Sequence, residues 1–315
     1  MAKLPDWPTL AGRAKKSVIR KAVDKILKLP RTERKKLWEA VKNDIEFYKN
    51  LDDPNFEFLY LKLSDNTKAV GNELLLRFYK ILGSKTGFSK IAGLKGRVNG
   101  AILEKLYREA NKKCAICPAC LVERLPRPID GISQNDREHY FPQSIYPPLA
   151  VHPFNLTMAC IRCNQRRHSN IDPISDHKAG ALLDSFLPYT RPGLNQIELQ
   201  FTVAATTGMV KISGKPGEVR AGKRVKNFDR IYKLSKYWSD YLEAIDNRLR
   251  EGVLARSPTP TLADTKRILG EMLALDERTK TSEPEAFLRA QYTTWILNER
   301  LTTWFKDLTE KSGPG

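Results

Sequence analysis

The sequence predicts an α+β protein that is mainly α-helical, with a small zinc-stapled unit at its centre, a β-hairpin after it, and helical regions at both ends. Three observations predict this class. Apolar residues recur at helical spacing on both sides of the centre, a β-branched segment lies near residue 200, and all five cysteines fall between residues 114 and 163. We therefore expect three domains, residues 1–112, 113–175 and 176–315.

The N-terminal region carries the first helical pattern, in residues 13–50. Its apolar residues recur at intervals of three and four: Val18, Ile19, Val23, Ile26 and Leu27, then Leu37, Val41 and Ile45. Pro30 interrupts the pattern, and Thr32 is the expected N-cap of a second helix. Further helices are expected over residues 69–82, closed by Gly83, and over residues 100–111.

The C-terminal region begins with IELQFTVAATTGMVKISG, residues 197–214, whose β-branched residues on both sides of Thr-Thr-Gly predict a two-stranded hairpin. Helical spacing returns in residues 228–253, 262–275 and 283–311. Ser282 followed by Glu285 has the spacing of a capping box for the last helix. The aromatic residues expected in the helical core are Tyr232, Tyr237, Trp238 and Tyr241.

The charge of the chain favours a polyanionic partner. Lys and Arg outnumber Asp and Glu by 54 to 36, which gives a net charge of +18 and a pI near 9.7. The N-terminus lacks the apolar run of a secretory signal, and no stretch approaches the roughly 18 consecutive apolar residues of a membrane helix. We expect a cytoplasmic protein without a membrane partner.

The cysteines predict a structural zinc site. Zn²⁺ prefers four tetrahedral thiolate or imidazole ligands, which two C-x2-C turns provide, whereas an odd number of closely spaced cysteines does not form a disulfide framework. Cys160 and Cys163 form one such turn. With four thiolates the ion has no open coordination position, so this zinc is expected to hold the scaffold and not to react.

The second C-x2-C turn is ambiguous, because CAICPAC contains two overlapping units that share Cys117. The residue after the second cysteine of such a turn often needs a positive φ, which Pro118 cannot adopt and Leu121 can. We therefore expect Cys117 and Cys120 as the ligands, with Cys114 as the alternate.

A second cluster of polar residues has the chemistry of phosphodiester hydrolysis. That reaction needs a base that activates water and a cation that neutralises developing negative charge. His139 suits the base, because an ordinary imidazole is largely neutral at cellular pH. Glu138 and the side-chain carbonyl of Asn164 offer the oxygen ligands that Mg²⁺ or Mn²⁺ prefers.

In this segment the sequence resembles the HNH endonucleases of the ββα-metal (His-Me finger) fold. Their pattern is an acidic residue and His, two further residues and Pro, then Asn-Leu, then C-x2-C-Asn and a basic residue three positions later. Here it reads Glu138, His139, Pro142, Asn155-Leu156, Cys160, Cys163, Asn164 and Arg167. The spacing is also similar to the HNH domain of the RNA-guided CRISPR nuclease. The match covers residues 114–170, under a fifth of the chain.

The resemblance implies a role for each of these residues. His139 would be the general base, Glu138 and Asn164 the ligands of the catalytic ion, and Asn155 the residue that fixes the loop between the strands and holds the histidine. The implied activity is metal-dependent cleavage of DNA that leaves a 5′-phosphate and a 3′-hydroxyl.

The implied partners follow from the same resemblance. Arg166 and Arg167 are the expected phosphate contacts, and RNA is the alternative substrate. Similar stand-alone nucleases often belong to bacterial defence systems or mobile elements, so a regulatory partner protein is a hypothesis, as is a homo-oligomer that would cut both strands. The alternative function is a zinc-stabilised nucleic-acid-binding or scaffold protein that does not cleave.

The remaining polar residues near the motif are expected to have minor roles. His152, His168 and His177 lie off the motif positions, which predicts residues at the surface or beside the site. Asn170 and Asp172 are predicted to form a turn.

Overall fold

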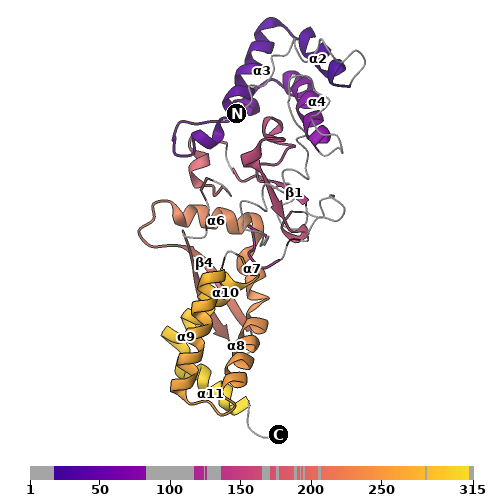
Figure 1. Ribbon diagram of the computed structural model, residues 1–315. Coiled ribbons are helices and arrows are strands. Elements are labelled where there is room, and N and C mark those ends of the chain that lie inside the picture. The colour runs from indigo at the N-terminus through magenta and orange to yellow at the C-terminus, as the bar shows by residue number, and fades with distance from the viewer. Residues whose placement is uncertain are drawn as a thin grey trace. The chain divides into compact units, whose positions relative to one another are not determined.

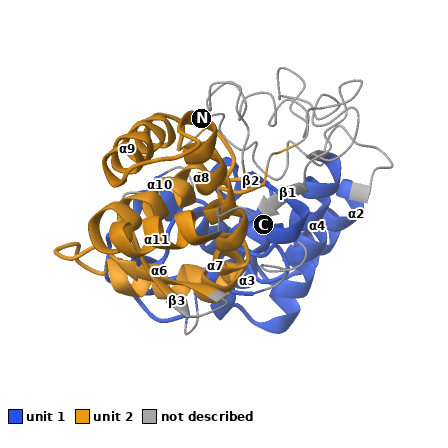
Figure 2. Ribbon diagram, turned by 90° about the horizontal axis from the view of Figure 1, so that it is seen from below, with its two compact units in different colours: residues 1–110, 126–193 blue, residues 111–125, 194–315 orange. Residues whose placement is uncertain are grey.

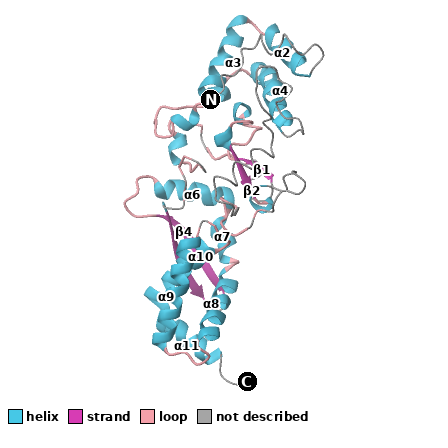
Figure 3. Cartoon of the chain, in the orientation of Figure 1, coloured by secondary structure: helices cyan, strands magenta, loops and turns pink. Residues whose placement is uncertain are grey.

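The computed structural model of the 315-residue chain is mainly helical (Figures 1 and 3), which confirms the α+β, mainly helical class. It describes residues 18–82, 117–123, 125, 136–164, 171–174, 177–187, 190–191, 193, 196–204, 207–280 and 282–311. The chain divides into two compact units (Figure 2), residues 1–110 with 126–193 and residues 111–125 with 194–315. The functional division into three domains stays a prediction. Within the described residues, no helix combines the length and apolar composition needed to span a bilayer.

The first unit begins with α2 (Val18–Lys28), α3 (Arg31–Asp44) and α4 (Asp65–Leu82). Their inward residues form one apolar cluster that includes Ala22, Val23, Ile26, Leu37, Val41 and Leu74. Each of these side chains is withdrawn from water, which stabilises the helices through burial and not through propensity alone.

The helix boundaries differ from the predicted ones in two places. Pro30 separates α2 from α3 as predicted, but Thr32 is not the N-cap, because the helix begins at Arg31 and Pro30 takes the capping position. Proline is compatible with a helix start, where backbone N–H groups lack intrahelical partners. α4 starts four residues before the predicted position, at Asp65. Gly83 and the helix predicted over residues 100–111 lie outside the described residues.

The buried carboxylate of Asp44 organises the segment after α3, which holds the short helices η1 (Phe47–Lys49) and η2 (Leu59–Lys62). Asp44 accepts hydrogen bonds from the backbone N–H groups of Leu59 and Tyr60, at 2.8 and 3.1 Å, and from the side chain of Asn43 at 3.0 Å. Burial raises the pKa of Asp44 to about 7.

A short antiparallel pair follows, β1 (Asp136–His139) with β2 (Leu156–Ala159), in which His139 lies opposite Leu156. The connection contains η4 (Pro147–Leu149) and η5 (Pro153–Asn155). A buried aromatic cluster joins this connection to the helical segment of the same unit: Phe47, Phe58, Phe141 and Tyr146, whose contacting rings have centroids 4.8 to 6.4 Å apart. The strand pair therefore rests on a rigid apolar support.

The end of the first unit is tied down by Arg191, which is 7% exposed. Its guanidinium donates to the carbonyls of Leu182, Leu183 and Ser185 around η7 (Ala181–Asp184), and to Asp52 at 2.6 Å. A planar guanidinium with five donors suits this multiple capping of carbonyl groups.

The second unit contains the predicted hairpin, which is confirmed as β3 (Ile197–Ala204) and β4 (Thr207–Gly214). Among the described residues of this unit, seven helical elements follow: α6 (Ala221–Tyr232), α7 (Leu234–Ser239), α8 (Leu242–Arg256), α9 (Leu262–Thr279), α10 (Ala286–Trp295), the π-helical η9 (Ile296–Arg300) and α11 (Leu301–Lys311). Tyr232, Tyr237 and Trp238 are buried, as predicted for helical core residues, whereas Tyr241 is half-buried.

The capping box predicted at Ser282 and Glu285 is wrong. Glu285 itself takes the N-cap position of α10, with a left-handed φ of +62° and no side-chain cap. The hydroxyl of Ser282 donates to the carbonyl of Thr279 at the end of α9. A capping box is formed by Thr261 and Asp264, at the start of α9.

Two close approaches fix the second unit. A Cβ on Gly214, at the end of β4, would meet the backbone N of Gly222 in α6 at 2.3 Å, so only glycine permits this packing. At the other end, the carboxylate of Asp246 accepts hydrogen bonds from Tyr292 at 3.2 Å and from the indole of Trp304 at 2.6 Å. These contacts set the positions of α6, α8, α10 and α11.

Candidate metal centre and active site

Four cysteines form a cluster suited to a metal ion. The sulfur atoms of Cys117, Cys120, Cys160 and Cys163 all lie within 4.8 Å of one another, and all four side chains are buried. Zn–S bonds of about 2.3 Å in a tetrahedron place the sulfurs about 3.8 Å apart, so this cluster is close to the spacing that zinc requires. The four residues could hold a metal ion such as zinc. Cys114 lies outside the described residues.

The backbone of the first cysteine turn has the predicted conformation. The N–H of Leu121 donates to the carbonyl of Cys117 at 2.9 Å, and Leu121 has a φ of +57°. A branched residue in the left-handed region is unfavourable by about 1 to 2 kcal/mol, so packing around the turn must maintain it. In the second turn, the carbonyl of Cys160 accepts from the N–H groups of Cys163 and Asn164, each at 3.0 Å.

His139 ends β1 and has a defined ring orientation. Its Nε2 lies 2.9 Å from the carbonyl oxygen of Ala150. Because a carbonyl only accepts, Nε2 carries the hydrogen in this contact, and in the neutral ring Nδ1 holds the lone pair. The ring of Tyr79, from α4, meets the His139 ring edge-to-face with centroids 4.4 Å apart. The backbone between the strands and a distant helix therefore both orient the imidazole.

Asn155 fixes the loop between β1 and β2. It is 1% exposed, its Oδ1 accepts from the N–H of Phe141 at 2.7 Å, and its Nδ2 donates to the carbonyls of Phe141 and Leu149 at 3.1 and 3.0 Å. Its backbone carbonyl accepts from the N–H of Tyr140 at 3.0 Å. This one side chain therefore connects the residues just after His139 with the end of η4, next to Ala150.

The other predicted site residues are described only in part. The backbone of Glu138 pairs with that of Thr157 in the strand ladder, while its side chain lies outside the described residues. Asn164 is half-buried in the helical turn directly after Cys163. Arg166 and Arg167 lie outside the described residues. The described geometry thus brings His139 and Asn155 together around one loop and leaves the ligands of a catalytic ion as a prediction.

Two contacts of His139 were not anticipated from the sequence. The carbonyl of Ala150 carries no side-chain signal, because any residue offers the same backbone group. Tyr79 lies sixty residues before His139 in a helix whose periodicity does not distinguish it from its neighbours. Only the folded chain brings either group to the imidazole.

His152, which was predicted at the surface or beside the site, is half-buried and packs against aromatic rings. Its ring lies 5.2 Å from that of Phe47 and 5.5 Å from that of Tyr48, and its Nδ1 accepts from the N–H of Phe154. Burial lowers the pKa of His152 to about 4, so the ring is neutral near pH 7.

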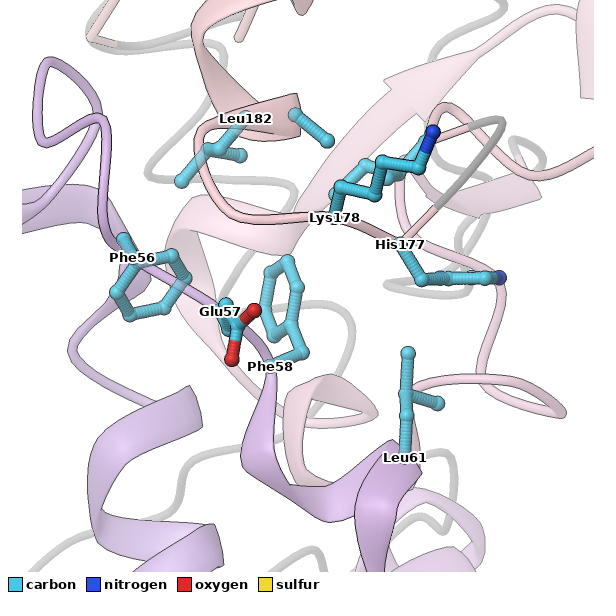
Figure 4. Close-up of a pocket in the computed structure, with 9 residues that line it drawn as sticks. Phe56, Glu57, Phe58, Leu61, His177, Lys178 and Leu182 are labelled. Carbon is cyan, nitrogen blue, oxygen red and sulfur yellow. The ribbon is translucent and has the colours of Figure 1, made fainter.

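His177 is exposed and lies beside a small hollow (Figure 4). Its Nε2 lies 3.2 Å from the carboxylate of Asp172, which also accepts from the Tyr146 hydroxyl and from the N–H of Ile174. The last bond is the turn predicted at Asp172. The residues that line the hollow are Phe56, Glu57, Phe58, Leu61, Ile174, His177, Lys178, Ala181 and Leu182. His168 and Asn170 lie outside the described residues.

Comparison with known proteins returns no relative, because no family model, no curated protein and no solved structure matches the chain. The resemblance in residues 114–170 therefore rests on the identity and spacing of those residues. The geometry of the described residues supports the implied function independently of that resemblance.

Proposed function

We propose that the chain is a metal-dependent endonuclease of the HNH type, which hydrolyses phosphodiester bonds of DNA with His139 as the general base. The observation that supports the base is the contact between His139 Nε2 and the carbonyl of Ala150. This contact favours the tautomer in which Nε2 carries the hydrogen and Nδ1 is the basic nitrogen. It also limits rotation of the imidazole ring. A general base needs this kind of orientation before its pKa matters.

In this proposal Nδ1 of His139 takes the proton of the attacking water. Asn155 acts on the reaction indirectly, because it holds the loop that carries the carbonyl of Ala150. The edge-to-face contact with Tyr79 also limits rotation of the His139 ring. Together these residues keep one imidazole nitrogen in place. A base held in position accelerates the reaction more than a mobile base of the same pKa.

Glu138 and Asn164 are the residues proposed to hold Mg²⁺ or Mn²⁺. A carboxylate and an amide oxygen form a donor set that a hard divalent cation accepts, with the remaining positions left to water and phosphate. The bound ion would supply charge neutralisation at the phosphate and the leaving oxygen. Asn164 follows the second cysteine turn directly, so the fold of that turn sets where its backbone lies.

The zinc proposed at Cys117, Cys120, Cys160 and Cys163 has a structural role. Four thiolates fill a tetrahedral site, so no position remains for water or substrate. Metal binding would hold the two C-x2-C turns together and contribute directly to folding stability. The proposal therefore separates two metals by chemistry, a soft sulfur site for structure and an oxygen site for catalysis.

The test is conversion of supercoiled plasmid to nicked or linear DNA by the purified chain with Mg²⁺ or Mn²⁺. We expect cutting that His139→Ala reduces by about a thousandfold, within the range for loss of a general base. His177→Ala is the matched control, because His177 is an exposed histidine that lies off the motif. Equal activity of the His139→Ala protein and the parent would reject His139 as the base.

The second candidate function is a nucleic-acid-binding scaffold that does not cleave. Binding and cutting assays on the parent protein distinguish it from the nuclease. If the parent protein binds DNA without cutting plasmid under any metal condition, and an RNA substrate also stays intact, the scaffold reading is favoured. Cutting of RNA alone would keep the chemistry of His139 and change the substrate.

A further inference from the structure

The basic residues of the chain are not equally available to a ligand. In the N-terminal helices many of them face carboxylates of the same unit: Lys25 lies 2.6 Å from Glu73, Lys35 3.7 Å from Glu39, and Lys36 3.0 Å from Glu33. Such pairs contribute little to stability, but they reduce the local positive charge that an anion would meet. High lysine content alone therefore does not identify an anion-binding surface in this protein.

The helix α6 and the start of α7 differ from this pattern. Their exposed basic side chains are Lys223, Lys226, Arg230, Lys233 and Lys236, which we call the α6–α7 basic row. Within the part of the chain that the structure describes, no carboxylate lies within 4.0 Å of the ammonium groups of its four lysines. The charge of these four lysines is therefore not offset by an ion pair within the described residues.

The one acidic residue of α6, Asp229, is directed to the start of α7. Its carboxylate accepts from the backbone N–H of Ser235 at 2.7 Å and from the Ser235 hydroxyl at 2.6 Å. Both oxygens are thus engaged at the start of α7. Asp229 therefore keeps its charge, holds the junction between the two helices and forms no ion pair with the four lysines.

The row is also ordered in space. Lys223, Lys226 and Arg230 follow each other by three and four residues, which places them on one face of α6, while Val225 and Ile231 face the core. The side chain of Arg230 is oriented by Asn227, whose Oδ1 accepts from Nη2 at 2.8 Å. The helix itself is fixed by the close approach of Gly214 to Gly222.

We propose that the α6–α7 basic row binds the phosphate backbone of double-stranded DNA. Seven residues of α-helix span about 10.5 Å, and one DNA strand carries a charge about every 3.4 Å along its axis, so the stretch from Lys223 to Arg230 matches about three phosphates. The exposed positions of α6 are Gly222 and these basic residues, with no exposed apolar side chain between them. A protein or membrane partner would require apolar anchors, whereas phosphate contacts do not.

The inference takes DNA as the ligand from the function proposed above, but its test measures binding and not cutting. We would measure fluorescence anisotropy of a labelled 30-bp duplex with the full chain carrying His139→Ala, over a series of salt concentrations. The test variant adds Lys223→Ala and Lys226→Ala. The matched control instead adds Lys35→Ala and Lys36→Ala, two exposed lysines of α3 that face carboxylates. Both variants lose two positive charges.

We expect the test variant to bind about tenfold more weakly near 0.1 M salt, with a slope of log K against log salt shallower by about 1.8, because two phosphate contacts are lost. The control should stay within about twofold of its parent, since its lysines make no phosphate contact. Equal weakening of both variants would show that net charge alone drives binding and would overturn the proposal, as would an unchanged slope in the test variant. If the slope changes as expected but the chain with His139 intact cuts neither plasmid nor RNA, the DNA-binding surface stands and the nuclease is rejected.

Discussion

The ring of Tyr79 contacts the ring of His139 edge-to-face at a centroid distance of 4.4 Å, although sixty residues separate them. Tyr79 belongs to α4, whose apolar neighbours pack in the N-terminal helical core, so the contact links that core to the end of β1. An edge-to-face pair contributes about 0.5–1.5 kcal/mol beyond area burial, enough to favour one ring orientation over others. The N-terminal helices of this unit therefore take part in setting the geometry of the proposed base.

Replacing Tyr79 tests this positioning role. Tyr79→Ala should lower plasmid cutting about tenfold, because the imidazole gains rotational freedom. Tyr79→Phe keeps the ring and should stay close to the parent rate. Both proteins should give the same pH profile as the parent, since Tyr79 is not proposed to exchange a proton. A Tyr79→Phe protein as impaired as Tyr79→Ala would argue that the hydroxyl, and not the ring, matters.

Asn155 should be essential for stability as well as for activity. Asn155→Ala leaves the N–H of Phe141 and the carbonyl of Leu149 without their partner in a buried loop, a loss of about 2–4 kcal/mol. Asn155→Asp should lower the stability at least as much, because a carboxylate oxygen then faces the carbonyls of Phe141 and Leu149 in place of the donating amide nitrogen. Urea unfolding measures both. Asn50→Ala is the control, since Asn50 bonds a carbonyl near the surface, and a similar loss there would remove the special role of Asn155.

Asp44 should make stability depend on pH. Its folded pKa of about 7 lies above the ordinary value of 3.8, so between these values the folded state binds more protons than the unfolded state. The stabilising contribution is therefore complete below about pH 4 and is lost as pH rises through 7, by an amount on the order of 4 kcal/mol.

The variant Asp44→Asn removes this dependence, because an amide does not titrate. The free energy of unfolding of the parent should fall more between pH 5.5 and pH 8.5 than that of Asp44→Asn. At low pH Asp44→Asn should be the less stable protein, because it replaces an oxygen that accepts a backbone N–H by an amino group. Parallel pH curves for the two proteins would contradict the raised pKa. Asp65→Asn, at a fully exposed carboxylate, should follow the parent curve.

Replacement of Gly214 and of Gly222 by alanine should change the stability of the protein in opposite directions. Gly214→Ala places a methyl group 2.3 Å from the backbone N of Gly222, so β4 and α6 must separate, at a cost of about 1–3 kcal/mol or more. A Cβ on Gly222 meets nothing within 4 Å, and alanine favours the helix, so Gly222→Ala should be neutral or stabilising by up to about 1 kcal/mol. Thermal unfolding of the pair checks the packing of α6. A tolerated Gly214→Ala would show that the contact is less close.

The cysteine cluster should determine metal content. The purified chain should carry about one zinc ion per molecule, and Cys120→Ser or Cys163→Ser should lower both the zinc content and the melting temperature, because serine is a poor zinc ligand. Atomic emission measures the metal directly. Full zinc occupancy in both variants would exclude the four-thiolate site. Cys114→Ser should retain zinc if Cys117 and Cys120 are the ligands.

The sequence predicted the elements whose signals are local. Pro30 separates two helices because proline cannot continue one, and the hairpin at residues 197–214 formed because its β-branched residues favour extended chain. The positive φ of Leu121 followed from the exclusion of Pro118. In each case the deciding interaction lies within a few residues.

The sequence could not predict contacts made between distant segments. Ser282 and Glu285 have the spacing of a capping box, yet the chain enters α10 through a left-handed Glu285 whose N–H donates to the carbonyl of Leu121. His152 lies off the motif and was predicted at the surface or beside the site, and the structure packs its ring against those of Phe47 and Tyr48. Tertiary packing determines both the start of α10 and the environment of His152, and such packing leaves no signal in the local sequence pattern.

The π-helical segment Ile296–Arg300 has a consequence for how the length of this chain can vary. An α-helix turns about 100° per residue, so inserting or deleting one residue normally rotates everything beyond it to a new face. A π-turn accommodates one residue more than an α-turn, and η9 lies between Tyr292 and Trp304, which both donate to Asp246. With both flanks anchored to one acceptor, η9 is the place where the final helix can lose one residue and still present the same face on either side.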